Sequence, residues 1–250
     1  MATPNLSSEA PEVTLAHERA ARVRAEAQVF GRDYVLSVAS HDLRGPLNAI
    51  HTWAHVLERK LGETDASIGR ALAGIRAGVE QQVGLIEKII DRPRMATRHL
   101  VITRAPTALK PLCEDVIGNA RLTLGYRDLS LEWNGDPKTA DVDAERLWQA
   151  WWCMLACASD LSTDVAADAA SLTAIDAPAD TNVLRVSIEQ GNCVTTLVTV
   201  APVLDKSVLE QNLALPRRVA EAHGGQCTIE QQTESGEVTM VMMFPLSSRS

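Results

Sequence analysis

The hydrophobic positions of the first hundred residues repeat with helical spacing. Over residues 13–34 apolar side chains recur every three or four positions, which predicts a helix with one narrow apolar seam, the pattern of a coiled coil. The seam changes phase near residue 35 and then continues to Leu61, where Gly62 ends the predicted helix. A second run over residues 68–89 predicts another long helix after a short link. Together these patterns predict an antiparallel helical hairpin.

Each predicted helix carries an apolar stripe that a single partner helix cannot cover. The simplest arrangement is a four-helix bundle formed by two copies of the chain, so we expect a homodimer through the hairpin. Pro46 lies inside the first helix and predicts a kink there. We divide this half into a disordered tail at 1–10, rich in Ser, Pro and Ala, and a coiled-coil lead-in with the hairpin at 11–104.

The second half of the chain alternates between strand-like and helix-like patterns. The pair Gly191-Asn192 separates two strand-like runs and predicts a two-residue hairpin turn. An Ala- and Asp-rich stretch at 164–182 predicts a loop with room for a helical turn. Strands are predicted at 100–103, 130–133, 183–190, 193–200, 227–232 and 237–244, and helices at 108–123, 143–159 and 213–222. The predicted fold class is therefore a helical hairpin followed by an α+β sandwich over 105–250.

Charge divides the chain at about the same place. The 250 residues carry a net charge of −8, but residues 1–104 hold 14 basic and 12 acidic side chains, whereas 105–250 hold 10 basic and 20 acidic ones. An acidic second half disfavours nucleic acid as a partner. No apolar stretch is long enough to span a bilayer and no signal segment opens the chain, while the five cysteines follow no disulfide pattern. We therefore expect a cytoplasmic protein.

The sharpest candidate chemistry lies in the segment Ser-His-Asp-Leu-Arg-Gly-Pro-Leu at 40–47. A neutral His41 imidazole beside the Asp42 carboxylate can act as a nucleophile, with the carboxylate fixing the imidazole tautomer. Arg44 can steady a transferred phosphoryl group. The same residues are also compatible with a solvated histidine beside a local Asp–Arg network, so the residue types alone leave both interpretations open.

This segment closely resembles the H-box of sensor histidine kinases of two-component systems. The family pattern is Ser-His-Glu/Asp-Leu-Arg-x-Pro-Leu, and every fixed position matches residues 40–47. The resemblance implies that His41 is the phosphoacceptor and that Asp42 is its acid/base neighbour. It also implies that a response-regulator receiver domain docks near His41, and we expect Gly45 and Leu47 to lie in that docking surface.

The second half resembles the ATP-binding domain of the same family, but its nucleotide-binding positions depart from the family pattern. Where the resemblance places two asparagines and a lysine on one helix, this chain has Cys153, Cys157 and Asp160. A thiol is a poor ligand for Mg²⁺, and an aspartate repels a polyphosphate. Where the family has Gly-x-Gly, the chain reads Glu210-Gln211-Asn212, and no glycine occurs between Asn192 and His223. These departures disfavour ATP binding.

The interpretation that fits both halves is a phosphorelay protein that accepts and donates a phosphoryl group on His41 without using ATP. It needs no cofactor or metal of its own, because the receiver brings the Mg²⁺. One alternative is a non-catalytic pseudokinase scaffold that binds another histidine kinase or a receiver. Another is an active ATP-dependent autokinase with an atypical nucleotide site.

Overall fold

The computed structural model describes residues 6–61, 66–91, 100–126, 129–136, 139–168, 183–201 and 206–246. The chain divides into two compact units, and each is described here by itself. One unit combines residues 1–31 with 100–250, and the other is 32–99. The first helix, α1 (Leu6–Leu61), contributes to both units. These units confirm the predicted fold class of a helical hairpin and a separate α/β domain.

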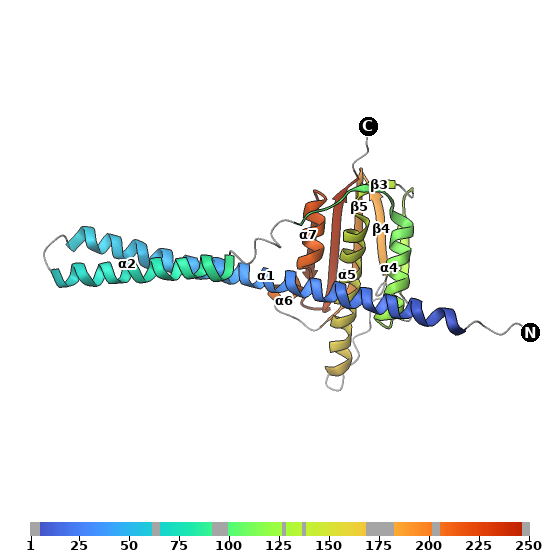
Figure 1. Cartoon of the computed structure of the whole chain (residues 1–250), viewed down its shortest axis with the longest axis horizontal. Coiled ribbons are helices and arrows are strands. Elements are labelled where there is room, and N and C mark those ends of the chain that lie inside the picture. The colour runs from blue at the N-terminus through green and yellow to red at the C-terminus, as the bar shows by residue number, and fades with distance from the viewer. Residues whose placement is uncertain are drawn as a thin grey trace, which may run out of the picture. The chain divides into compact units, whose positions relative to one another are not determined.

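The α/β unit (Figure 1) is built on a five-stranded sheet, whose strand order is β2-β4-β5-β7-β6. Strands β2 and β4 are parallel, and the other neighbours are antiparallel. A separate antiparallel pair joins β1 to β3. The strands are β1 (Ala105–Ala108), β2 (Ser130–Asn134), β3 (Thr139–Val142), β4 (Val183–Glu189), β5 (Asn192–Val200), β6 (Gln226–Gln231) and β7 (Glu237–Pro245).

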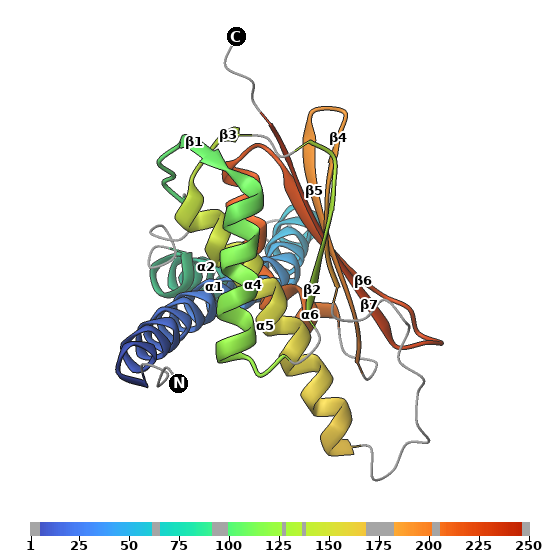
Figure 2. The ribbon, with the colours of Figure 1, turned by 90° about the vertical axis from the view of Figure 1, so that its right-hand side faces the viewer.

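Helices cover one face of this sheet, as Figure 2 shows. They are α4 (Leu109–Thr123), α5 (Ala144–Asp168), α6 (Lys206–Asn212) and α7 (Ala214–Ala222). Helix α5 is central, and its Trp151 reaches the sheet, where the indole Nε1–H donates a hydrogen bond of 3.0 Å to the Thr195 hydroxyl of β5. Trp148, Trp151 and Trp152 are all fully buried. Residues 147–158 of α5 are all buried, because this part of the helix is enclosed by the sheet and by α1.

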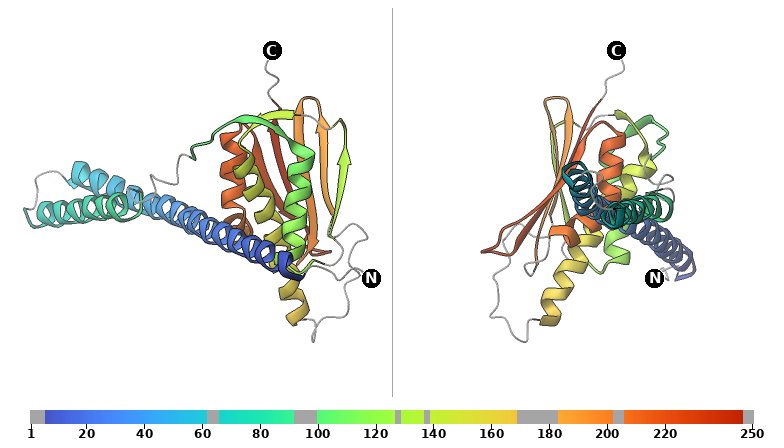
Figure 3. Two further views of the ribbon diagram at one scale, coloured as in Figure 1. Left: turned by 45° about the vertical axis from the view of Figure 1, so that its right-hand side comes forward. Right: turned by 90° about the vertical axis from the view of Figure 1, so that its left-hand side faces the viewer.

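The N-terminal part of α1, residues 6–31, lies across the helix layer of the α/β unit (Figure 3). The seam residues Ala20, Val23 and Phe30 are buried within the single chain. This differs from the sequence expectation, which grouped residues 11–31 with the hairpin as a coiled-coil lead-in. The apolar seam that predicts a coiled coil is covered here by the chain's own α/β unit.

The other unit is an antiparallel helical hairpin. Residues 32–61 of α1 pair with α2 (Ala66–Ile86), which continues into a π-helical turn, η1 (Glu87–Asp91). The helix runs through Pro46 as one assigned element. Among the described residues of the single hairpin, the buried apolar ones are Ala54, Leu72, Val79 and Ile86. Many others are exposed, including Ile50, Trp53, Leu57, Ile68, Ile75, Leu85 and Ile89. An exposed apolar surface of this kind is what a second hairpin would cover.

Several sequence predictions need correction. The strand expected at 100–103 lies instead at Ala105–Ala108, where Pro106 is tolerated because this short strand has one partner only. The hairpin turn is Gln190-Gly191 and not Gly191-Asn192, since both turn residues have positive φ and Glu189 pairs with Asn192. Strand β3 and helix α6 were not predicted, because short segments give little periodicity.

The ends of two segments also differ from the sequence predictions. Residues 6–10 are helical, so only 1–5 of the predicted disordered tail falls outside the described residues. Helix α5 extends to Asp168, well into the stretch predicted as a loop, and residues 169–182 of that stretch lie outside the described residues. Among the described residues, no helix is long and apolar enough to cross a bilayer.

The buried histidine of the α/β unit predicts acid sensitivity. His223 accepts a hydrogen bond of 3.0 Å from the Asp143 backbone N–H, and its Nδ1 lies 2.8 Å from the Val219 carbonyl. Burial lowers the pKa of His223 below its usual 6.5. Because the unfolded state then binds the proton more readily, the free energy of unfolding falls as pH drops below about 6.5 through the lowered pKa.

We therefore expect the melting temperature to fall between pH 7 and pH 5, and to fall less steeply in His223→Gln. Thermal denaturation at several pH values measures both slopes. If the melting temperature of both proteins changes equally with pH, His223 is not the cause of the acid sensitivity.

Candidate functional site

His41 stands out on the surface of the hairpin unit. Its side chain is 91% exposed, and its Nδ1 lies 3.3 Å from a carboxylate oxygen of Asp42, whose side chain is also largely exposed. An Nδ1–H directed at this carboxylate leaves the lone pair of Nε2 free toward solvent. The helix thus offers an accessible nucleophilic nitrogen held by a neighbouring carboxylate.

Two residues near His41 both contact Asp91 of η1: Ser40, which directly precedes it, and Arg44, which lies three positions after it. The Ser40 hydroxyl donates a hydrogen bond of 3.1 Å to Asp91 Oδ1, and the Arg44 guanidinium forms an ion pair with Asp91 Oδ2. Ser40 is buried, whereas Arg44 and Asp91 are partly exposed. Arg44 therefore holds the second helix of the hairpin through Asp91, a residue that the sequence analysis missed.

Asp91 was missed because nothing in the sequence fixes which residue of the second helix lies opposite His41. Its only signal is an acidic residue close to the end of the predicted helix. Gly45 is exposed with open space beside its Cα, and Leu47 is half-buried two residues further along α1. Both lie on the same helix as His41, where we expected a docking surface.

A small pocket lies over α5 in the α/β unit. Its volume is about 200 Å³, below the 300–1,000 Å³ that is usual for a site holding a drug-sized ligand. It brings together four of the five positions that the resemblance assigns to a nucleotide site: Cys153, Cys157, Asp160 and Asn212. The remaining wall is part of α1, including Arg24, Gln28 and Gly31. The fifth position, Glu210, is not among the lining residues and lies 3.9 Å from both Lys206 and Arg217.

The thiols in this pocket are buried and poorly reactive. Burial raises the pKa of Cys157 to about 12, and it also raises the pKa of Cys153. Among the residues that the structure describes, no three His, Cys, Asp or Glu side chains are arranged to hold a metal ion. Cys153 and Cys157 therefore act here as small apolar residues of the α5 surface.

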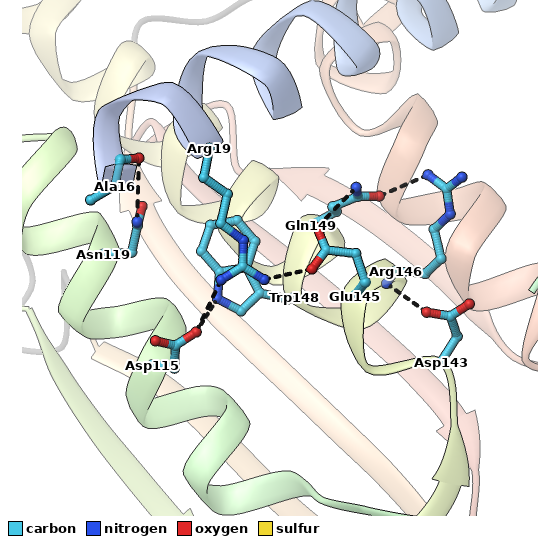
Figure 4. Close-up of polar contacts among 9 residues, drawn as sticks. All are labelled: Ala16, Arg19, Asp115, Asn119, Asp143, Glu145, Arg146, Trp148 and Gln149. Atoms are coloured by element: carbon cyan, nitrogen blue, oxygen red, sulfur yellow. Dashed lines mark hydrogen bonds and ion pairs between the residues drawn. The ribbon is translucent and has the colours of Figure 1, made fainter. Parts of the chain in front are cut away.

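Two arginines of α1, Arg19 and Arg24, hold it against the tryptophans of α5, and Figure 4 shows the contacts of Arg19. The Arg19 guanidinium lies 3.6 Å from the ring centroid of Trp148 and forms ion pairs with Asp115 of α4 (3.2 Å) and Glu145 of α5 (2.6 Å). The Trp148 indole Nε1–H donates to the same Asp115 carboxylate at 2.7 Å. A cation that stacks on an aromatic face and is shared by two carboxylates fixes one orientation of the helix.

One turn further on, the same arrangement repeats more loosely. Arg24 lies 5.6 Å from the Trp152 ring centroid and 3.4 Å from an Asp160 oxygen. Arg146 of α5 reaches back to Glu26 at 2.5 Å. At Gly31 an added Cβ would lie 3.1–3.2 Å from Gln211 atoms, so a residue without a side chain lets α1 approach α6 closely. We call residues 16–31 of α1 the docked segment.

Comparison with known proteins gives the class of the hairpin. Residues 32–98 match the family model of the His Kinase A (phospho-acceptor) domain, HisKA, and this match contains His41. The hairpin therefore matches a HisKA domain. A HisKA domain implies dimerisation and a partner in two-component signalling, in agreement with the exposed apolar residues of the hairpin.

Among solved structures, the chain is similar to a histidine kinase from Burkholderia phymatum STM815. The two are 29% identical, with a TM-score of 0.62, and the alignment covers 92% of this chain and 99% of the other. This chain also matches the Acinetobacter baumannii histidine kinase AdeS, with 13% identity and a TM-score of 0.44, over 83% of this chain and 98% of the other. It matches full-length ShkA in complex with AMPPNP with 16% identity and a TM-score of 0.43, over 86% of this chain and 46% of the other. No curated protein matches the chain.

Proposed function

We propose that this chain is a histidine phosphotransferase that carries a phosphoryl group on His41 and exchanges it with the aspartate of a receiver domain, without using ATP. The observation that carries the proposal is the exposed imidazole of His41, whose Nδ1 is turned to Asp42 and whose Nε2 is free. The HisKA match supports the partner class, because its domain is defined by a phosphoacceptor histidine.

The transfer follows from this geometry. The Nε2 lone pair of His41 attacks the phosphorus of the receiver's aspartyl phosphate, and the bond from phosphorus to the carboxylate oxygen breaks with its electron pair returning to that carboxylate. The imidazole becomes positive while it carries the phosphoryl group, and Asp42 stabilises that charge through the Nδ1–H. In the reverse direction the receiver's carboxylate attacks, and the N–P electron pair returns to Nε2. No net proton is exchanged, so the chain mainly positions the reacting groups.

The α/β unit offers poor conditions for ATP. Its pocket over α5 is small, is partly walled by the docked segment, and carries Asp160 where the resemblance places a lysine. Arg24, a cation in the lining of this pocket, is already paired with Asp160. A triphosphate with Mg²⁺ would need to displace part of α1 and would still find thiols in place of oxygen ligands. These features favour a phosphoryl supply from a receiver over a supply from ATP.

Paired labelling tests the proposal. The full-length chain is incubated with radiolabelled ATP and Mg²⁺, and separately with receiver domains that have been phosphorylated by radiolabelled acetyl phosphate and freed of the reagent. We expect label on the chain only from a receiver. Label from ATP would overturn the proposal in favour of an autokinase. Label from neither source would overturn it in favour of a scaffold that binds a histidine kinase or a receiver.

A further inference from the structure

Asp91, on the second helix of the hairpin, contacts two residues close to His41. It is the last residue of the π-helical turn η1, and wide turns of this kind often occur at functional sites. Its two oxygens have different contacts: Oδ1 accepts from Ser40, and Oδ2 pairs with Arg44. Because Ser40 is buried, its hydrogen bond fixes the carboxylate so that the second oxygen faces Arg44.

Arg44 is also the cation best placed to meet a phosphoryl group on His41. The two residues are three positions apart on one helix, so their side chains are neighbours on the helix surface. A phosphoryl group brings roughly two negative charges and three strong acceptor oxygens. Asp91 and a phosphorylated His41 would therefore compete for the same guanidinium, a planar group that binds carboxylates and phosphates through paired hydrogen bonds.

We propose that Asp91 is a positioning residue that limits how far Arg44 can bind a phosphoryl group on His41, and that it thereby sets the share of phosphoryl groups held by His41 and by the receiver. This inference rests on the proposed function. Asp91 holds Arg44 against the second helix, so Arg44 binds the phosphoryl group on His41 less strongly than it would if Asp91 were absent. Phosphorylated His41 is therefore less stable. Phosphoryl groups then leave His41 more readily for the receiver's aspartate.

The Asp91→Asn variant separates the charge of Asp91 from its shape. The amide retains an oxygen that can accept from Ser40, but it no longer holds Arg44 as an ion pair. We expect the equilibrium ratio of label on His41 to label on the receiver to rise about fivefold, the size expected for releasing one partly exposed ion pair. The ratio is measured on the full-length chain after equilibration with a labelled receiver.

Two further variants show whether Asp91 acts through Arg44. In an Arg44→Gln background, Asp91→Asn should change the ratio by less than about 1.5-fold, because no guanidinium is left to release. Glu58→Gln is the matched control, since it breaks another ion pair of the hairpin, Arg76–Glu58 at 3.0 Å, away from His41. It should leave the ratio unchanged. A similar rise in the Arg44→Gln background or in Glu58→Gln would mean that loosening of the hairpin, and not release of Arg44, causes the effect.

Failure of the inference is distinguishable from failure of the proposed function. If the parent chain exchanges phosphoryl groups but Asp91→Asn leaves the ratio unchanged or lowers it, the inference is overturned and the proposed function stands. If the parent chain takes no label from a receiver, His41 can be phosphorylated chemically with phosphoramidate. Phosphohistidine should then hydrolyse more slowly in Asp91→Asn than in the parent chain, and equal hydrolysis rates would also overturn the inference.

Discussion

The His41→Gln variant is expected to lose all transfer of label from a phosphorylated receiver, a drop of at least about a hundredfold that reaches the background of the assay. The amide of glutamine has no nucleophilic nitrogen, so no N–P bond can form. Because the His41 side chain is 91% exposed and its polar contact is with the likewise solvent-facing Asp42, the melting temperature should change by less than about 1 °C. Labelling and thermal denaturation are measured on the same preparations.

His51→Gln provides the matched control for this experiment. His51 is exposed on the same helix and outside the H-box segment, so its loss should leave labelling intact. Label that persists in His41→Gln would show that another residue accepts the phosphoryl group, and the role of His41 would have to be abandoned.

The second large effect is expected from Val23→Asp in the docked segment. Val23 is 1% exposed, so the new carboxylate would either be buried without a partner or force the segment away from α5. We expect the free energy of unfolding of the α/β unit to fall by about 3 kcal/mol. Two thiols that lie against the docked segment, Cys153 and Cys157, should become reactive toward a thiol reagent at pH 8, where burial now keeps them protonated.

Counting reactive thiols separates undocking from unfolding. All five cysteines are buried and free, but Cys113, Cys193 and Cys227 are not among the residues that line the pocket beneath the docked segment. Release of the segment alone therefore exposes two thiols, and global unfolding exposes five. Val29→Asp is the matched control, because Val29 is 40% exposed on the same helix and should tolerate a charge within about 0.5 kcal/mol. No reactive thiol in Val23→Asp would show that the segment does not protect α5.

The elements that were predicted well are those in which the spacing of apolar residues repeats over a long stretch of sequence. The hairpin, α4 and the β4–β5 and β6–β7 hairpins each repeat an apolar spacing over many residues, and the structure places them close to the predicted bounds. Helix α5 begins within one residue of its predicted start but runs on to Asp168. The misplaced or missing elements are short. In β1 and β3 only four residues form each strand, and their pairing depends on a neighbour far along the chain.

The candidate site shows the same division between local and distant information. The His41–Asp42 contact joins neighbours in the sequence, so the H-box segment was sufficient to predict it. The ion pair of Arg44 with Asp91 joins residues 47 positions apart, and no pattern in one sequence sets the register of two helices so finely. The docked segment was misassigned for a related reason: a seam such as Ala20, Val23 and Phe30 predicts that something covers it, but it does not say what.

The distribution of the five tryptophans gives each unit its own optical signal. Trp148, Trp151 and Trp152 are fully enclosed, so their fluorescence should be blue-shifted and should report on the integrity of the α/β unit. Trp53 is the single tryptophan of residues 32–99, and it is 67% exposed. In a Trp53→Phe protein the red-shifted part of the emission should fall, with the remainder coming from the partly exposed Trp133 of β2. In the parent chain the quenching of Trp53 by iodide then provides a direct spectroscopic measure of whether a second hairpin or a receiver covers that surface.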